Sequence, residues 1–187
     1  MDTISFLDIV FSLALLASMG TGFARGFLRQ LTDLAALYVG LAVSAQYTPM
    51  VAATLNPLVA SMPYYLISAL VFFGVMSLVG GVLSLAAHVL MRPGGVSRRE
   101  LSDISQVGGL VLAAFQTSAV IAISIPVLRY AISASWGSWD ATREVLVRAV
   151  NNSYLVPIFN SFTPSVVAAI SPLLPGGLPD VLRGRAL

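Results

Sequence analysis

Two carboxylates lie within runs of apolar residues, and they are the side chains in this sequence that most suggest chemistry. Asp8 interrupts an apolar run over residues 4–22, and Asp33 follows a short stretch that also carries Arg25 and Arg29. An ionised group in an apolar environment is costly, so its usual functional interpretation is a relay for protons or ions. Asp8 and Asp33 are therefore the first candidates for a functional site.

Other kinds of chemistry find little support among the remaining residues. Nucleophilic catalysis needs a serine with a neighbouring base, and the one histidine is His88. A lone histidine on a membrane helix is more often hydrogen-bonded structure than a catalytic base, and we interpret His88 in this way. The chain has no cysteine, and no group of histidines and carboxylates has metal-binding spacing. We expect no enzymatic activity, no metal and no cofactor.

The composition places these residues in a membrane. Hydrophobic residues make up 57% of the chain and charged residues 10%, whereas soluble domains have about 25% charged residues. The mean hydropathy is +0.89. The net charge is only +2 and there is no dense basic run, so nucleic acid is not an expected partner. We predict an integral membrane protein in contact with membrane lipids.

Four transmembrane helices are predicted, at about residues 4–23, 27–47, 64–91 and 107–128, because each apolar run is long enough to cross the hydrocarbon. Together they form an all-α, four-helix membrane domain over residues 1–130. The connection at residues 46–63 holds three prolines and predicts a loop, with one short helix over residues 50–55. Ser97 and Glu100 have the spacing of a capping box, which predicts a short surface helix before the fourth span.

The stretch from Gly20 to Asp33 predicts a tight turn at the membrane surface between the first two spans. Its glycines, Gly22 and Gly26 among them, allow helix ends and turn to pack closely. Either of two arginines is a candidate partner for Asp33, because Arg29 precedes it by one helical turn and Arg25 lies at the turn.

The two acids are expected near opposite faces of the membrane. At a rise of 1.5 Å per residue in a core about 30 Å thick, Asp8 and Asp33 are separated by about 15 Å of depth, so they cannot share a proton directly. We interpret both as partners in ion pairs rather than as a transport path. For Asp8 the leading candidate partner is Arg129, at the exit of the fourth span.

The tail, residues 131–187, is predicted to lie on the outer surface of the membrane as interfacial helices. Residues 140–150 have an amphipathic pattern. Thr163 and Pro164 predict a cap and first turn for a short helix that ends near Pro172. Residues 156–170 are interrupted by prolines, so we do not predict a fifth span, and a re-entrant segment is the alternative.

Arginines set the expected orientation. The connection at residues 46–63 has no arginine, whereas the connections before and after it have five in total. Because arginines are enriched in cytoplasmic loops, these two connections are expected in the cytoplasm, and the amino terminus and the tail are expected outside. These five are Arg25, Arg29, Arg92, Arg98 and Arg99.

Several segments of the sequence resemble the colicin V production proteins. The similarity covers roughly residues 4–128, and it rests on Leu7-Asp8-Ile9-Val10, on Gly22-Phe23-Ala24-Arg25-Gly26-Phe27, on residues 31–42 and on Asp103 to Leu110. The chain departs from the family pattern at Ile104, where an arginine is typical, and at Ala113 and Ala114, which replace a second glycine-rich step.

The resemblance implies a bacterial inner-membrane protein linked to colicin V production or export and to envelope upkeep. A related helical unit precedes extracytoplasmic serine proteases, which agrees with a carboxyl terminus outside the cell. The residues expected to matter are Asp8, Gly22, Arg25, Gly26, Arg29, Asp33, Asp103, Gly108 and Arg129.

Two functions are compatible with these observations. The first is a non-enzymatic scaffold or accessory protein for an envelope or export assembly, with other membrane or envelope proteins as partners. The second is a small channel or transporter built from a homo-oligomer, with the intramembrane acids lining its path. Hydrated acids on a continuous cavity would favour the second function, and acids held in pairs would favour the first.

Overall fold

Helices dominate the computed structural model, which describes residues 5–59, 62–90, 103–174 and 177–183. The four longest are α1 (Phe6–Arg25), α2 (Phe27–Leu55), α3 (Tyr64–Leu90) and α4 (Asp103–Ile132). Shorter helices follow, namely α5 (Asp140–Asn151), α6 (Leu155–Ile170) and α7 (Asp180–Arg183), with single 3-10 turns at Gly137–Trp139 and Ser171–Leu173. No strand occurs in these described ranges, so the all-α prediction is confirmed for them.

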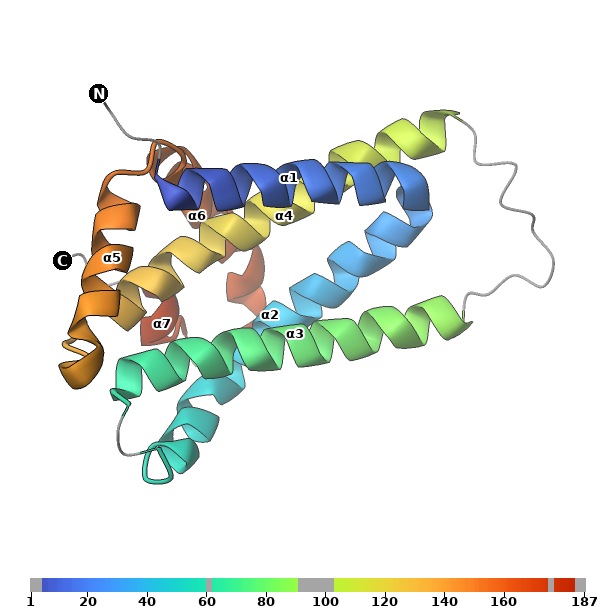
Figure 1. The fold of residues 1–187 in the computed structure, drawn as a ribbon. Helices are drawn as coiled ribbons and strands as arrows, with labels where there is room; N and C mark the ends of the chain where they lie inside the picture. The colour runs from blue at the N-terminus through green and yellow to red at the C-terminus, as the bar shows by residue number, and fades with distance from the viewer. Residues whose placement is uncertain (1–4, 60–61, 91–102, 175–176, 184–187) are drawn as a thin grey trace.

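Helix α4 is the centre of the bundle. It packs along α1 and also contacts α2, α3, α5, α6 and α7, while α2 packs along α3. Its residues Ile123, Ile125 and Val127 are at most 2% exposed. A helical segment that is apolar on every side is expected to be surrounded by other helices, as α4 is from Ala119 onward. Figure 1 shows α1, α3 and α4 extended in much the same direction, with α2 oblique to them and α5 lying across one end.

Two apolar clusters hold the bundle together. One joins α2, α3, α4, α6 and α7 through residues such as Leu41, Phe72 and Ile170. The other joins α1, α4, α5 and α6, and in it the rings of Phe11 and Phe159 meet edge to face at 6.1 Å. The second cluster ties the tail to the end of the bundle at which α1 begins.

The outward faces of the long helices are apolar. Leu13, Leu28, Leu78 and Phe115 are each at least 60% exposed, and many other large apolar side chains share this exposure. Five helices are long and apolar enough to cross a membrane: the four longest and a segment at Leu155–Leu173. The expected number was four, because the prolines of the tail were taken to interrupt the last of these segments.

Two segments that were predicted to interrupt helices are continuous helix in the structure. Helix α2 runs through Pro49 to Leu55, so the prediction of a loop from residue 46 was wrong over its first half. Helix α6 runs through Pro164 and begins at Leu155, so the predicted helix start at Thr163 was also wrong. Proline is tolerated inside membrane helices because neighbouring groups satisfy the freed backbone.

The remaining boundaries agree more closely. Helix α3 matches the predicted span, α5 matches the predicted amphipathic helix, and α4 is longer than predicted at both ends. The surface helix predicted at Ser97 lies outside the described residues.

Candidate functional site

Gly26 makes the turn between α1 and α2. Its φ of 79° lies in the left-handed region that favours glycine, and its backbone N–H donates to the carbonyl of Gly22 at 2.9 Å. The backbone N–H of Phe27, which begins α2, donates to Ser105 Oγ on α4 at 3.3 Å. The tight turn predicted from the sequence is therefore confirmed.

Glycines also allow α1 and α4 to cross closely beside this turn. A Cβ at Gly22 would lie 2.5 Å from the carbonyl oxygen of Gly109, and a Cβ at Gly109 would lie 2.8 Å from the carbonyl carbon of Gly26. Gly108 faces the ring of Phe27, with 3.1 Å between its would-be Cβ and Cδ2. Three of the expected residues, Gly22, Gly26 and Gly108, thus meet at one crossing, which places Arg25 beside α4.

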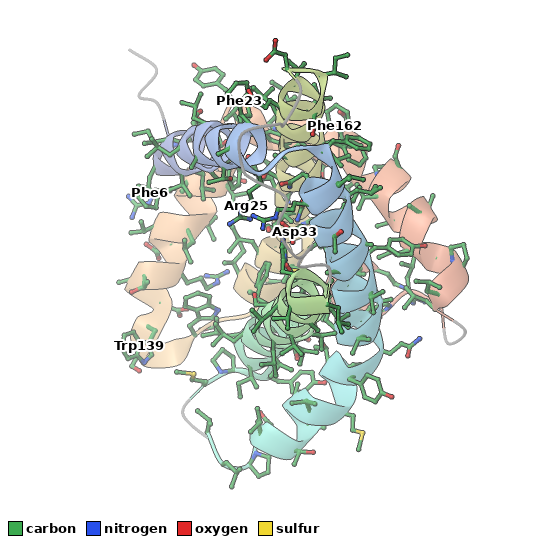
Figure 2. The ribbon with its side chains drawn as sticks, turned by 90° about the vertical axis from the view of Figure 1, so that its right-hand side faces the viewer. Phe6, Phe23, Arg25, Asp33, Trp139 and Phe162 are labelled. Atoms are coloured by element: carbon green, nitrogen blue, oxygen red, sulfur yellow. The ribbon has the colours of Figure 1, made fainter. Side chains whose placement is uncertain are left out.

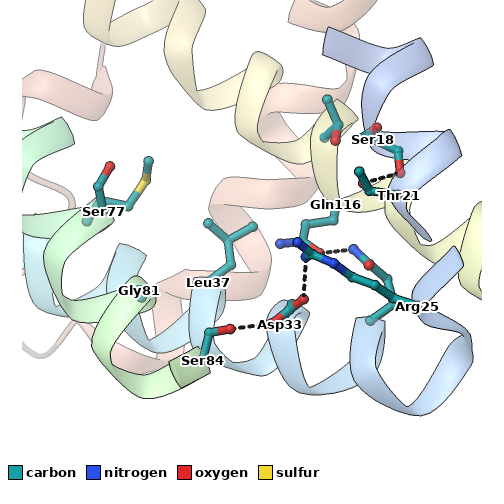
Figure 3. A pocket seen from close by; sticks show the side chains of 13 residues that line it. Ser18, Thr21, Arg25, Asp33, Leu37, Ser77, Gly81, Ser84 and Gln116 are labelled. Carbon is teal, nitrogen blue, oxygen red and sulfur yellow. Dashed lines mark hydrogen bonds and ion pairs between the residues drawn. The ribbon is translucent and has the colours of Figure 1, made fainter. Parts of the chain in front are cut away.

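A polar cavity of about 360 Å³ lies between the four longest helices, next to this crossing (Figure 3). Hydroxyl, amide and charged side chains form much of its wall. The lining residues are Ser18, Thr21 and Arg25 of α1, Gln30, Asp33 and Leu37 of α2, Met76, Ser77, Gly80, Gly81 and Ser84 of α3, and Gln116 and Thr117 of α4.

Asp33 is held from two sides at the wall of this cavity. Arg25 Nη1 lies 3.3 Å from Asp33 Oδ2, and Ser84 Oγ donates to Asp33 Oδ1. His88 Nδ1 lies 3.8 Å from Asp33 Oδ1. Of the two arginines left open by the sequence, Arg25 is the partner, and Arg29 is exposed at the surface. The carboxylate therefore lies between an arginine at the turn and the end of α3.

Two further polar groups were missed by the sequence analysis. Gln30 Nε2 donates to Gln116 Oε1 at 2.5 Å, which joins α2 to α4 at the back of the cavity. A glutamine in each of two apolar runs was the available signal, since a buried amide in a membrane helix requires a partner.

Asp8 has a different environment from the one expected. Its carboxylate accepts hydrogen bonds from Ser153 Oγ at 2.5 Å, from the backbone N–H of Leu155 at 3.0 Å and from that of Tyr154 at 3.3 Å. The backbone N–H of Ser5 donates to it at 3.2 Å, as part of a capping box at the start of α1. The expected pairing with Arg129 was wrong, because the free amide groups at the start of α6 satisfy the carboxylate instead.

The signal for this arrangement was present in the sequence. Ser5 and Asp8 have capping-box spacing, and Ser153 precedes an apolar run as a cap residue would. Ser153 Oγ also accepts from the backbone N–H of Val156 at 3.1 Å. The pairing of α1 with α6 could not be read from this spacing, because the two segments are more than 140 residues apart.

The structure keeps the two acids apart. The cavity is lined by Asp33 but not by Asp8, which is 7% exposed at the other end of α1. Among the other expected residues, Asp103 is the exposed first residue of α4 and Arg129 is half-buried near its end. Within the described part of the chain, no three histidines or carboxylates come close enough to hold a metal ion.

The fold is that of a multi-pass α-helical membrane protein. Its long helices are apolar, their outward faces expose leucine and phenylalanine, and polar groups gather inside the bundle. The sequence profile of the family described as Colicin V production protein matches residues 7–164. The chain therefore belongs to this family, as its resemblance indicated. Comparisons with curated proteins and with solved structures gave no significant match.

Proposed function

We propose that the protein is a non-enzymatic scaffold or accessory subunit for an envelope or export assembly in the bacterial inner membrane. The observation that carries this proposal is the docking of the tail on Asp8, which fixes α5 and α6 across the end of the bundle at which α1 begins. Asp8 is thereby engaged in joining two parts of the chain. A rigid surface of this kind suits the binding of other membrane or envelope proteins, or of a second copy.

Four crossings are the topology that we infer for this scaffold. Helix α6 contacts α1 at Phe11, its Thr163 Oγ1 donates to the carbonyl of Ala122 at 2.9 Å, and Gln46 Nε2 donates to the carbonyl of Leu173 at 2.7 Å. These partners lie in the half of the bundle away from Gly26. In Figure 1, α6 stays at that end and lies across the direction of α1 and α4. Both features support a tilted helix within one leaflet.

The orientation follows from the arginines. Arg25 and Arg29, on either side of the Gly26 turn, and the arginines of the connection before α4 favour a cytoplasmic location, which puts the Asp8 end, α5 and α6 on the extracytoplasmic side. A reporter fused after residue 187 should be active only outside the cytoplasm, as should one fused before residue 1. Opposite locations for the two reporters would mean an odd number of crossings and would overturn this topology.

The polar groups around Asp33 support a non-enzymatic role. In a nucleophilic triad the histidine accepts the proton of the serine hydroxyl. Here the Ser84 hydroxyl donates to Asp33, and His88 Nδ1 lies 2.6 Å from the Ser84 carbonyl oxygen, which is an acceptor. This arrangement directs the hydroxyl hydrogen to the carboxylate rather than to the imidazole.

A channel or transporter is the second candidate function, and the cavity that Asp33 lines is the observation in its favour. The two candidates differ in what Asp33→Asn should do. For a scaffold, the change should lower the yield of folded or assembled protein more than any ion flux, because it removes the ion pair with Arg25. Flux through liposomes that disappears while folded protein remains at the wild-type level would replace the scaffold with a transporter.

A further inference from the structure

The cavity between the four helices has hydrogen-bonding capacity that the protein itself does not use. Arg25 carries five N–H donors, and only Nη1 contacts Asp33. The hydroxyls of Ser77 and Thr117 make no hydrogen bond to any described residue, although both side chains line the cavity. Polar groups at membrane depth are costly unless they find partners, so a polar occupant is expected here.

The position of the cavity indicates where this occupant comes from. Arg25 lies in the last turn of α1, and its side chain is 52% exposed at the end of the bundle that contains the turn (Figure 2). Ser18, seven residues earlier, lines the cavity about 10 Å deeper along the helix. The polar wall thus runs from the level of the lipid headgroups into the hydrocarbon.

The helices that form this polar wall also carry exposed apolar side chains close in sequence to its residues. Phe23 is 45% exposed, Phe27 42% and Leu28 75%, and all three are within three residues of Arg25. On α3, Leu85 is 67% exposed, one residue after Ser84. A polar cavity in helices whose outward faces are apolar is complementary to an amphiphile whose headgroup enters the cavity while its acyl chains lie along those faces.

The charges of the cavity select among headgroups. Arg25 is a planar donor suited to a phosphate, and Asp33 is an acceptor 3.3 Å from it, so the pair is neutral overall. A headgroup with one negative and one positive group satisfies both residues, whereas a purely anionic one is repelled by Asp33. The volume of about 360 Å³ falls within the range of about 300–1,000 Å³ that is typical of small-molecule sites.

We propose that this cavity binds the zwitterionic phosphoethanolamine headgroup of a phospholipid, with the phosphate at Arg25 and the ammonium at Asp33. This assignment is independent of the scaffold proposal, because it concerns the opposite end of the bundle from Asp8. A water-soluble phosphoethanolamine compound carries the same headgroup as the phospholipid, and the experiment distinguishes the two ligands.

The experiment measures lipid binding to the full chain, purified in detergent free of phospholipid, by the shift in its unfolding temperature and by native mass spectrometry. The probes are short-chain phosphatidylethanolamine, short-chain phosphatidylglycerol and soluble glycerophosphoethanolamine. We expect saturable binding of phosphatidylethanolamine at least tenfold tighter than that of phosphatidylglycerol. Binding of glycerophosphoethanolamine with equal affinity would identify a soluble compound as the source of the same headgroup.

Matched variants test whether the cavity is the site. Arg25→Gln should weaken binding of phosphatidylethanolamine about tenfold or more, since it removes charge-assisted hydrogen bonds, whereas Arg29→Gln removes the same charge four residues away and should leave it unchanged. Equal effects of the two substitutions, or equal binding of both phospholipids, would overturn the proposal.

A second pair of variants does not disturb the ion pair. Neither Gly81 nor Gly74 of α3 has any atom within 4 Å of a would-be Cβ, so each accepts a larger side chain, and only Gly81 is among the residues that line the cavity (Figure 3). Gly81→Phe should occupy the cavity and reduce binding of phosphatidylethanolamine at least tenfold, while Gly74→Phe should not. Unchanged binding in Gly81→Phe would exclude the cavity as the site.

Discussion

Substitution of Asp8 by alanine should release the tail from the bundle. In the structure this carboxylate accepts four hydrogen bonds, three from backbone N–H groups and one from Ser153 Oγ. A hydrogen bond to a charged group contributes about 1.5–3 kcal/mol. The four are not additive, because they share one acceptor group and water replaces some of them. We therefore expect Asp8→Ala to cost about 3 kcal/mol, because it leaves neutral donors without their charged acceptor.

Smaller changes at the same place should give graded effects. Asp8→Asn keeps the shape and one acceptor oxygen, but it turns an amide NH₂ group toward backbone donors, so we expect a loss of about 2 kcal/mol. Ser153→Ala removes one donor and should cost about 1 kcal/mol. The expected order of destabilisation is Asp8→Ala, then Asp8→Asn, then Ser153→Ala.

Hydrogen exchange followed by mass spectrometry is the suitable assay, because it reports the opening of α6 separately from the opening of α2 and α3. In Asp8→Ala, amides of residues 153–160 should exchange at least a hundredfold faster, which corresponds to about 3 kcal/mol, while those of residues 66–76 stay protected. Unchanged protection of residues 153–160 in a folded Asp8→Ala protein would refute the role that we assign to this carboxylate.

Two further predictions concern other parts of the molecule. Gly22→Ala should destabilise the protein by about 1–3 kcal/mol, because its Cβ would lie 2.5 Å from the carbonyl oxygen of Gly109. Gly20→Ala is the control, because the space around its Cβ is open, and it should leave the stability unchanged. Thermal unfolding of both variants in detergent measures the difference. Hydrogen bonds from Ser135 Oγ and from the backbone N–H of Trp136 hold the pKa of Asp140, at the start of α5, below its usual value. Its contribution to stability is therefore complete above the unfolded pKa, about 4, and decreases as the pH falls through the folded pKa. An acid-induced change in tryptophan fluorescence below pH 4 should be present in the wild type and absent in Asp140→Asn, and an identical change in both would contradict this assignment.

The sequence by itself determined features that depend on local spacing. Composition and the lengths of the apolar runs identified the membrane class, since crossing hydrocarbon requires helices of about 20 apolar residues. The Gly26 turn lies within a short stretch of chain, so local spacing was enough to anticipate it, and the same stretch limited the partner of Asp33 to Arg25 or Arg29, between which the structure decided for Arg25. The amphipathic pattern of α5 likewise needed only its own residues.

Tertiary structure alone decided the features that depend on distant segments. A proline removes one backbone donor and often ends a helix in water, but the membrane-length helices α2 and α6 continue through Pro49 and Pro164. Asp8 is satisfied by the start of α6 rather than by Arg129, and Gln30 meets Gln116 across two helices. The cavity is also a tertiary feature, because four helices contribute its wall and no local pattern sets their relative positions. A polar residue in an apolar run indicates that a hydrogen-bonding or charged partner is needed, but the packing of the helices determines which residue is that partner.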